Sequence, residues 1–320
     1  MWPADHGASA GASGPPVYPP ANVGEAIVTQ GLTKDYGRGK GLFELSLSVR
    51  EGEVFGYLGP NGAGKTTTIR LLMSLIRPTG GGASVFGLDT ITRSVDAKRL
   101  VGYLPGELAQ FGGLRGDEIV ASFAALRTDV DRSLVGELAE RLDLDLGRRY
   151  REYSRGNKQK LGIVLAFMHR PRLLILDEPT SGLDPLNQQT FYAFVREARE
   201  RGATIFLSSH ILSEVQAVCD RVGIIRAGRL VKVADLDELN ELHQRRVEVE
   251  FAGEPPLARL QALENIDRLD VDGSTVRCIV RGDIGEFVRA IATMHVVALT
   301  SAEPSLEESF LAYYRADPVA

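Results

Sequence analysis

The stretch Gly59-Pro60-Asn61-Gly62-Ala63-Gly64-Lys65-Thr66 decides the fold of the larger part of this chain. It fits the pattern G-x-x-x-x-G-K-[ST] at every fixed position and lies between a strand pattern, Glu53–Leu58, and a helix pattern from Lys65 through about Ile76. Glycines let consecutive backbone N–H groups point inward, and the helix N-terminus adds positive potential. Lys65 can then reach the β- and γ-phosphates of a nucleotide, and the Thr66 hydroxyl can ligate Mg²⁺. The expected nucleotide contacts are Gly59, Pro60, Asn61, Gly62, Ala63, Gly64, Lys65, Thr66 and Thr67.

Two other interpretations of this stretch are a glycine-rich turn with a solvated lysine and a dinucleotide fingerprint. The strand before the glycines and the helix after them favour a phosphate site over a plain turn. The dinucleotide fingerprint fails because Thr67 stands where its third glycine belongs. The sequence therefore predicts a site for a nucleoside triphosphate.

A second strand carries the carboxylates that such a site needs. Leu173–Leu176 is apolar at every residue, as expected of a strand covered by helices on both faces. Asp177 follows it and can reach Mg²⁺ directly or through water, and Glu178 is the candidate base that orients the attacking water. Two solvated acids capping an ordinary strand end are the alternative, which the phosphate loop disfavours.

The remaining pattern up to about residue 235 alternates strands and helices, which predicts an α/β domain on a largely parallel sheet. The segment from about 107 to 170 is mostly helical and is expected to be an insertion in that domain. Further expected elements are strands at Leu100–Leu104 and Ala203–Leu207, helices at Asp117–Leu126 and Leu134–Leu142, and a hairpin of Val222–Ile225 with Leu230–Val233.

A second, smaller α+β domain is expected over residues 245–320, and a disordered tail rich in Pro, Gly, Ala and Ser over residues 1–25. The signals of the smaller domain are alternation at Val247–Phe251, a tight turn at Asp272-Gly273, a helix at Ile284–Met294, a strand at Val296–Leu299 and a helix at Leu306–Tyr314.

Composition limits the classes of partner. The 320 residues carry a net charge of −5, which argues against nucleic acid as a partner. The two cysteines, Cys219 and Cys278, show no metal-binding spacing and fit a reducing compartment. Leu161–Met168 is far shorter than the roughly 20 apolar residues that span a bilayer, and the first residues do not form a secretory signal, so a cytoplasmic protein is expected.

Four further segments complete a family pattern. They are Tyr153-Ser154-Arg155-Gly156-Asn157-Lys158-Gln159, the run from Asp177 to Pro185, His210 after a strand, and Tyr36 upstream of the phosphate loop. Together they resemble the ATP-binding subunit of an ABC transporter over roughly residues 26–235. The resemblance implies a P-loop NTPase fold of the ABC type, with ATP and Mg²⁺ as cofactors.

The resemblance also implies roles for single residues. Tyr36 would stack on adenine, although a packed or loop tyrosine remains the alternative. Ser154 and Gly156 would bind the γ-phosphate of the ATP held by the other subunit of a homodimer, rather than merely cap a helix. Asp184 would couple the two sites, and His210 would contact the γ-phosphate and hold the water, rather than being a structural histidine.

The chain departs from the family pattern in two places. Of the usual signature Leu-Ser-Gly-Gly-Gln, only the serine and the second glycine remain, as Ser154 and Gly156. The family normally has glutamine where Gly106 stands, so coupling to the membrane partner would depend on Glu107, on Gln110 or on ordered water.

The end segment Glu303–Leu311 and the single ATPase domain resemble the ATPases of daunorubicin-resistance-type drug exporters, although a plain amphipathic helix explains the segment equally well. The resemblance implies an ATP-hydrolysing subunit, peripheral on the inner face of the cell membrane. It would power a separate permease that exports a drug-like or other hydrophobic compound, docking through the helical insertion and a groove near residues 103–112. In this family the smaller domain is associated with stabilising or regulating the dimer. The alternatives are a soluble ABC-type ATPase acting on ribosomes or DNA, and a nucleotide-binding scaffold without turnover, which the presence of Glu178 disfavours.

Overall fold

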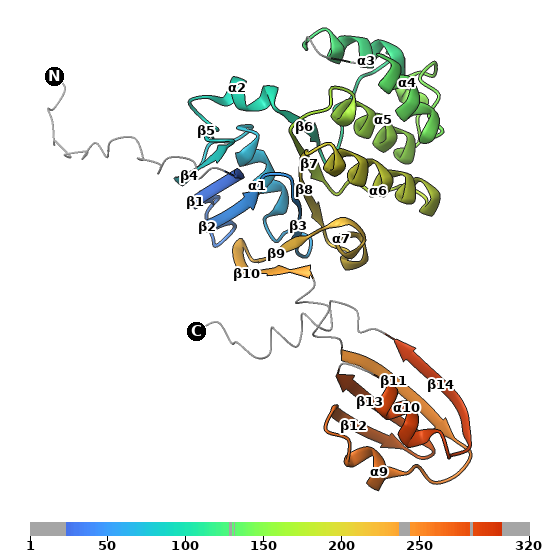
Figure 1. Ribbon diagram of the computed structural model, residues 1–320. Helices are drawn as coiled ribbons and strands as arrows, with labels where there is room; N and C mark the ends of the chain where they lie inside the picture. Colours follow the sequence, from blue (N-terminus) through green and yellow to red (C-terminus); the bar gives the residue numbers. More distant parts are fainter. Residues whose placement is uncertain (1–23, 128–129, 131, 237–243, 282–283, 303–320) are drawn as a thin grey trace, which may run out of the picture. The chain divides into compact units, whose positions relative to one another are not determined.

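The computed structural model describes residues 24–127, 130, 132–236, 244–281 and 284–302. These residues form two compact units (Figure 1). The first extends to Ile211 and includes Ala217–Val233, and the second comprises Leu212–Gln216 and the residues from Ala234 onward. The expected helix Leu306–Tyr314 and nearly all of the expected tail, residues 1–25, lie outside the described residues.

A six-stranded sheet forms the centre of the first unit, with the strand order β10-β9-β3-β8-β7-β6. β3 pairs in parallel with β8 and β9, and β7 pairs in parallel with β8 and β6. β3 and β7 are buried at every residue, which explains their uninterrupted apolar sequence. The expected α/β fold on a largely parallel sheet is confirmed. The strands are β3 (Val54–Leu58), β6 (Val101–Leu104), β7 (Leu173–Asp177), β8 (Thr204–Ser209), β9 (Arg221–Arg226) and β10 (Arg229–Asp235).

A second sheet in the same unit, with the order β2-β1-β4-β5, was not expected from the sequence. β1 pairs antiparallel with both β2 and β4. Helix α1 (Lys65–Leu72) contacts β2 and β4 of this sheet and β7 of the parallel sheet. One apolar core joins the two sheets, with Ile27 and Leu45 packed in the same cluster as Phe55 and Phe206. The strands are β1 (Glu25–Asp35), β2 (Gly41–Arg50), β4 (Gly80–Val85) and β5 (Leu88–Asp89).

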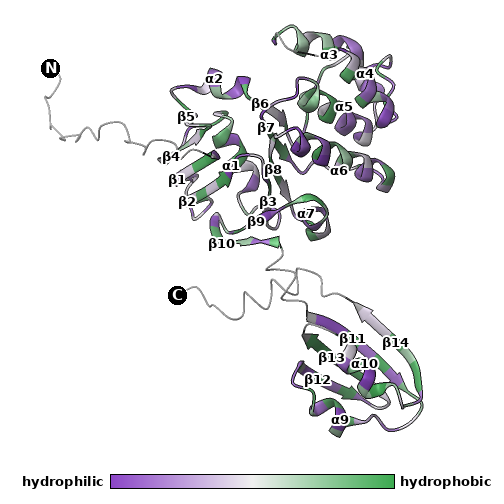
Figure 2. Ribbon diagram, viewed as in Figure 1, coloured by the Kyte–Doolittle hydropathy of each residue, from purple (hydrophilic) through white to green (hydrophobic). Residues whose placement is uncertain are grey.

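The expected helical insertion contains α3, α4 and α5, and hydrophilic and hydrophobic residues alternate along α4 and α6 (Figure 2). The helix expected from Lys65 to about Ile76 is shorter, because Met73 ends α1 and Ser74 has a left-handed φ of 49°. Within the described ranges, no helix combines the length and the apolarity that crossing a membrane requires. The helices are α2 (Ser94–Arg99), α3 (Gly116–Ala124), α4 (Arg132–Arg141), the 3-10 turn η1 (Tyr150–Glu152), α5 (Arg155–Phe167), α6 (Pro185–Glu200) and α7 (Leu212–Val218).

From Gln244 to Ala302, the described residues of the second unit form an antiparallel sheet with the order β12-β13-β11-β14 and two short helices. The turn between β12 and β13 is Gly273-Ser274, one residue later than expected, because pairing continues to Asp272↔Thr275. Helix α10 is shorter than the helix expected at Ile284–Met294, and strand β14 extends three residues beyond the strand expected at Val296–Leu299. The elements are β11 (Gln244–Phe251), α9 (Leu257–Gln261), β12 (Ile266–Asp272), β13 (Thr275–Arg281), α10 (Gly285–Ile291) and β14 (Val296–Ala302).

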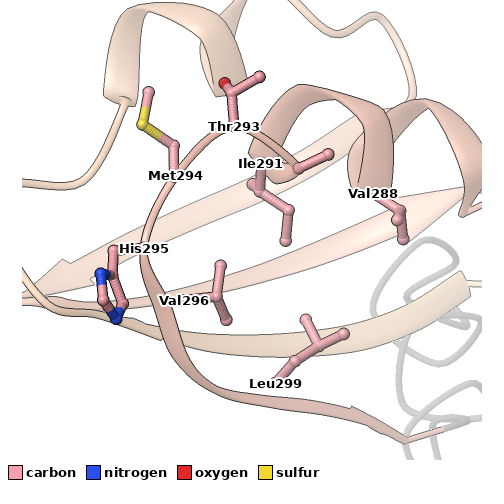
Figure 3. A pocket seen from close by; sticks show the side chains of 8 residues that line it. Val288, Ile291, Thr293, Met294, His295, Val296 and Leu299 are labelled. Atoms are coloured by element: carbon pink, nitrogen blue, oxygen red, sulfur yellow. The ribbon is translucent and has the colours of Figure 1, made fainter.

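A shallow groove of about 570 Å³ lies between α10 and the edge strand β14. Val288 and Ile291 from the helix face Val296 and Leu299 from the strand across this space (Figure 3). Val288 and Leu299 remain 41% and 47% exposed. The edge strand is therefore covered less completely than the centre of its sheet, where Val247 and Val249 are buried.

Candidate nucleotide site

The phosphate loop, Gly59–Thr66, turns sharply between β3 and α1. Gly62 and Gly64 have left-handed φ values of 80° and 111°, which residues with a Cβ rarely adopt. A Cβ on Gly59 would lie 2.3 Å from the carbonyl oxygen of Ile225. The glycines of the pattern are thus required by backbone geometry and by close approach, as the phosphate-loop interpretation predicts.

Lys65 begins α1 and its side chain folds back over the loop. Its Nζ donates to the carbonyl oxygens of Gly59 at 2.6 Å and Pro60 at 3.3 Å. The same atom lies 3.1 Å from Oε1 of Glu178, and the lysine side chain is only 5% exposed. A buried ammonium held in this way is a fixed positive charge at the mouth of the loop.

Asp177 ends β7 beside the loop. Its Oδ2 accepts a hydrogen bond from Thr66 Oγ1 at 2.9 Å, and its Oδ1 accepts one from Ser208 Oγ at 2.6 Å. Asp177 is 1% exposed, so both oxygens are held in fixed positions. Hydroxyl and carboxylate oxygens are the ligands that Mg²⁺ prefers, and the pair therefore fits this metal.

Glu178 follows Asp177 and lies between two partners. Its Oε1 faces Lys65, and its Oε2 lies 2.7 Å from Nδ1 of His210. His210 comes directly after β8, and its side chain is 44% exposed. A carboxylate held on both oxygens beside a histidine can accept a proton from water and keep its orientation.

The site forms where the carboxyl ends of parallel strands meet. The loop follows β3, Asp177 and Glu178 follow the core of β7, and His210 follows β8. Gly59 N donates to Ser209 O at 3.2 Å, which holds the ends of β3 and β8 together. In open α/β sheets, ligands bind at this edge. The structure thus brings together Lys65, Thr66, Asp177, Glu178 and His210, as the sequence predicted, while their chemical roles stay predictions.

The signature residues lie at the start of α5. Ser154 caps this helix and accepts a hydrogen bond from Asn157 N at 3.2 Å. A Cβ on Gly156 would lie 2.8 Å from Gly182 O, so glycine is needed there for close packing. The described contacts join neither residue to the phosphate loop of its own chain.

Asp184 caps α6 rather than contacting the phosphate loop. The backbone N–H of Asn187 donates to Oδ1 at 3.0 Å, and this bond is the main reason that the pKa of Asp184 lies below its usual value. The carboxylate therefore stays ionised at neutral pH.

Tyr36 lies in the turn between β1 and β2, with its side chain 55% exposed and Lys34 Nζ 5.5 Å from its ring centroid. The turn reaches the phosphate loop through Gly41, whose carbonyl oxygen is 3.5 Å from the position of a Cβ on Gly64. The described contacts include none from the Tyr36 ring to the loop, so its stacking role stays a prediction.

Gly106 lies directly beside the Asp177 carboxylate. A Cβ at this position would be 3.3 Å from Oδ2 of Asp177. Burial, and secondarily the charge of Asp177, raises the pKa of the nearby Tyr103 to about 12. Glu107 and Gln110 are exposed. The position at which the family normally has glutamine therefore lies beside Asp177, but this chain has a glycine there and no side chain that could take part.

The sequence interpretation gave no role to three residues at the site. Ser208 fixes Asp177, Gly228 N donates to Ala63 O at 2.9 Å, and Gln159 donates to the backbone of Glu178 and Pro179. The signal for Ser208 was its place at the end of a strand next to His210. Gln159 lay within the quoted signature segment but had no partner that the sequence could name.

Comparisons with known proteins agree with this geometry. Residues 42–181 match the family model described as ABC transporter. The chain is 33% identical to the bacitracin transport ATP-binding protein BcrA of Enterococcus faecalis, over 89% of this chain and 94% of the relative. It is also 33% identical to the daunorubicin resistance ATP-binding protein DrrA3 of Streptomyces coeruleorubidus, over 89% and 95%.

A solved structure described as an ATP-binding subunit of an ABC transporter superposes with a TM-score of 0.62 and 29% identity, covering 67% of this chain and 92% of that one. The expectation of an ABC-type P-loop fold is confirmed. The soluble alternative, an ATPase of ribosomes or DNA, gains no support from these relatives. The chain belongs to the ABC transporter family, as an ATP-binding subunit that hydrolyses ATP to drive transport.

Proposed function

We propose that this protein is the Mg²⁺-dependent ATPase subunit of an exporter. It works as a homodimer on a separate membrane permease and exports a drug-like or other hydrophobic compound. The observation that supports the proposal most is the convergence of Lys65, Thr66, Asp177, Glu178 and His210 at one edge of the sheet. The names of the relatives support the class of cargo, since they refer to bacitracin transport and daunorubicin resistance.

The phosphate loop provides binding. Its backbone N–H groups and the N-terminus of α1 present positive potential to the phosphates, and the buried Lys65 ammonium adds a full charge. Thr66 and Asp177 would hold Mg²⁺, which when bound neutralises the charge of the phosphate oxygens. Ser208 keeps the Asp177 carboxylate turned toward Thr66.

Glu178 and His210 would orient and activate the water that attacks the nucleotide. Glu178 holds the water in line and accepts its proton, and the 2.7 Å contact with Nδ1 of His210 fixes the plane of the carboxylate. His210 would contact the terminal phosphate through its other ring nitrogen, Nε2. This arrangement acts by positioning, which dominates phosphoryl transfer.

The homodimer would complete the site. Ser154 and Gly156 begin α5 and would contact the nucleotide bound by the partner, while Asp184 would couple the two sites. Dimer closure would then depend on ATP, and hydrolysis would release it. The smaller unit would stabilise or regulate this dimer, and Tyr36 would stack on the adenine.

Glu178→Gln tests the proposed chemistry. The amide keeps the size of the side chain and loses the base, so ATP binding should persist while turnover stops and a dimer accumulates. Equilibrium ATP binding, phosphate release and size-exclusion chromatography with Mg-ATP measure the three outcomes. Unchanged phosphate release would refute the role of Glu178.

The membrane partner needs its own test. The protein would dock on the cytoplasmic side of a permease through the helical insertion and the segment near residues 103–112, where Gly106 replaces the usual glutamine. Coupling there would pass through Glu107, Gln110 or ordered water. Affinity purification of the tagged protein from detergent-solubilised membranes should recover a multispanning protein, and recovery of ribosomes or DNA instead would contradict the proposal.

A further inference from the structure

Gln159 is a buried amide on α5 that contacts the backbone of the proposed base. Its Nε2 donates to Glu178 O at 3.2 Å and to Pro179 O at 2.8 Å, and the residue is 8% exposed. Both partners are carbonyl oxygens, which only accept hydrogen bonds, so the NH₂ group must face them. Gln159 thus contacts the main chain of the same residue whose carboxylate would act on water.

The backbone of Glu178 needs such support. Its φ is 50°, a left-handed conformation that residues with a side chain rarely adopt and that persists only where the surroundings hold it. The N–H of Glu178 donates to Ser208 O at 3.2 Å and to Ser208 Oγ at 3.1 Å. Gln159 holds the carbonyl on the other side of the residue. The two contacts together fix both peptide groups of Glu178.

The first turns of α5 hold the rest of this segment as well. Arg155 Nη2 donates to Ser181 Oγ at 2.8 Å, and Gly156 packs so closely on Gly182 that a Cβ would lie 2.8 Å from its carbonyl oxygen. Ser154 caps the same helix. The helix end that carries Ser154 and the segment that carries Glu178 are thus joined at three successive places.

We propose that Gln159 is a positioning residue for ATP hydrolysis. It fixes the strained backbone of Glu178 and so aims the carboxylate, and it links that carboxylate to the helix end at Ser154. The inference rests on the proposed function, because it assigns Gln159 a part in the reaction of the same site. The hydrogen bonds of Gln159 in the described structure go to two backbone carbonyl oxygens and not to the phosphate loop, so its loss should lower the rate of hydrolysis more than the binding of ATP.

The test replaces Gln159 by methionine, which has a similar length and donates no hydrogen bond. The matched control is Gln188→Met on α6, since Gln188 Nε2 donates to Leu183 O at 3.4 Å, at the far end of the same segment. The full-length proteins are compared in kcat, in KM for Mg-ATP, in Kd for a non-hydrolysable ATP analogue and in Tm.

Misplacement of the base predicts that Gln159→Met lowers kcat about 10- to 100-fold, with KM and Kd nearly unchanged. Gln188→Met should keep the kcat of the wild type. The positioning role is refuted if Gln159→Met keeps the wild-type kcat. It is also refuted if kcat, KM and Kd worsen together with Tm and the control behaves in the same way.

Gln159→Glu provides a second variant in case the methionine variant does not fold. An ionised carboxylate cannot donate to the two carbonyl oxygens, so kcat should fall at least as far with analogue binding retained. A wild-type protein without ATPase activity would refute the proposed function itself. Normal wild-type turnover together with normal turnover of the Gln159 variants would refute only the positioning role.

Discussion

The parallel sheet of the first unit and the antiparallel sheet of the second unit use their charged residues differently. In the parallel sheet the ends of β3, β7 and β8 lie side by side, and the loops after them bring Lys65, Glu178 and His210 within contact. In the antiparallel sheet of the second unit, Arg277 pairs with Glu248 across neighbouring strands on an exposed face. The comparison shows that strand direction, more than residue type, brings the functional groups together.

The largest expected effect is on the stability of the second unit, and it should leave ATP hydrolysis unchanged. Phe287 is fully buried in the core of that unit, so Phe287→Ala should lower its free energy of unfolding by about 3–5 kcal/mol. ATP hydrolysis per folded molecule should remain normal, because no described site contact involves this residue. Denaturant unfolding and phosphate release measure the two effects. A proportional loss of both would contradict the separation of the two regions.

Lys65→Ala, at the edge of the parallel sheet, should lower turnover and leave stability nearly unchanged, the reverse of Phe287→Ala. Removing a preorganised positive group from the phosphate loop should lower kcat/KM about 10²- to 10³-fold with little change in Tm. Lys98→Ala, on α2, removes the same charge outside the loop and serves as the control. Nucleotide affinity and turnover that survive Lys65→Ala intact would exclude this loop as the phosphate site.

Gly106→Ala tests how closely the site is packed. The new Cβ would lie 3.3 Å from Oδ2 of Asp177, a tight contact that displaces the carboxylate by a few tenths of an ångström. Turnover should fall only a few-fold, since a full 1 Å misplacement costs about 10²-fold. Steady-state ATPase assays over a Mg²⁺ titration measure it, and a rate above that of the wild type would show that the carboxylate is not the group affected.

The smallest effect concerns the groove of the second unit. Leu299 is 47% exposed at the edge strand, so Leu299→Ser should change the free energy of unfolding by less than about 0.5 kcal/mol and leave turnover unchanged. Urea unfolding of the full-length protein measures this change. A loss above about 2 kcal/mol would mean that the groove is covered in solution and behaves as core.

The sequence predicted the parallel sheet well and the first antiparallel sheet not at all. β3 and β7 are buried on both faces, so their apolar runs are unambiguous. β4 begins with Gly80-Gly81-Gly82, which reads as a break in a single sequence. These glycines form a strand because they pair with β1, at Gln30↔Gly82 and Thr33↔Gly80, and not because of their own strand propensity.

Some residues of the site were also predictable from the sequence, and others were not. Lys65, Asp177 and Glu178 were predictable because they lie at the start of a helix or the end of a strand that the pattern indicated, whereas His210 was predicted only through the resemblance to the ABC transporter family. The contacts of Gln159 were not, because an amide that donates to two carbonyl oxygens of a distant segment leaves no periodic signal. Helix ends were also missed, since α1 ends through the left-handed backbone of Ser74.

A crystal structure of the Glu178→Gln variant grown with Mg-ATP would show directly whether the phosphate loop binds the nucleotide. The terminal phosphates should lie at the loop Gly59–Thr66 within reach of Lys65 Nζ, with a metal ion held by Thr66 and Asp177. An empty loop, or a nucleotide bound away from the ends of β3 and β7, would contradict this prediction.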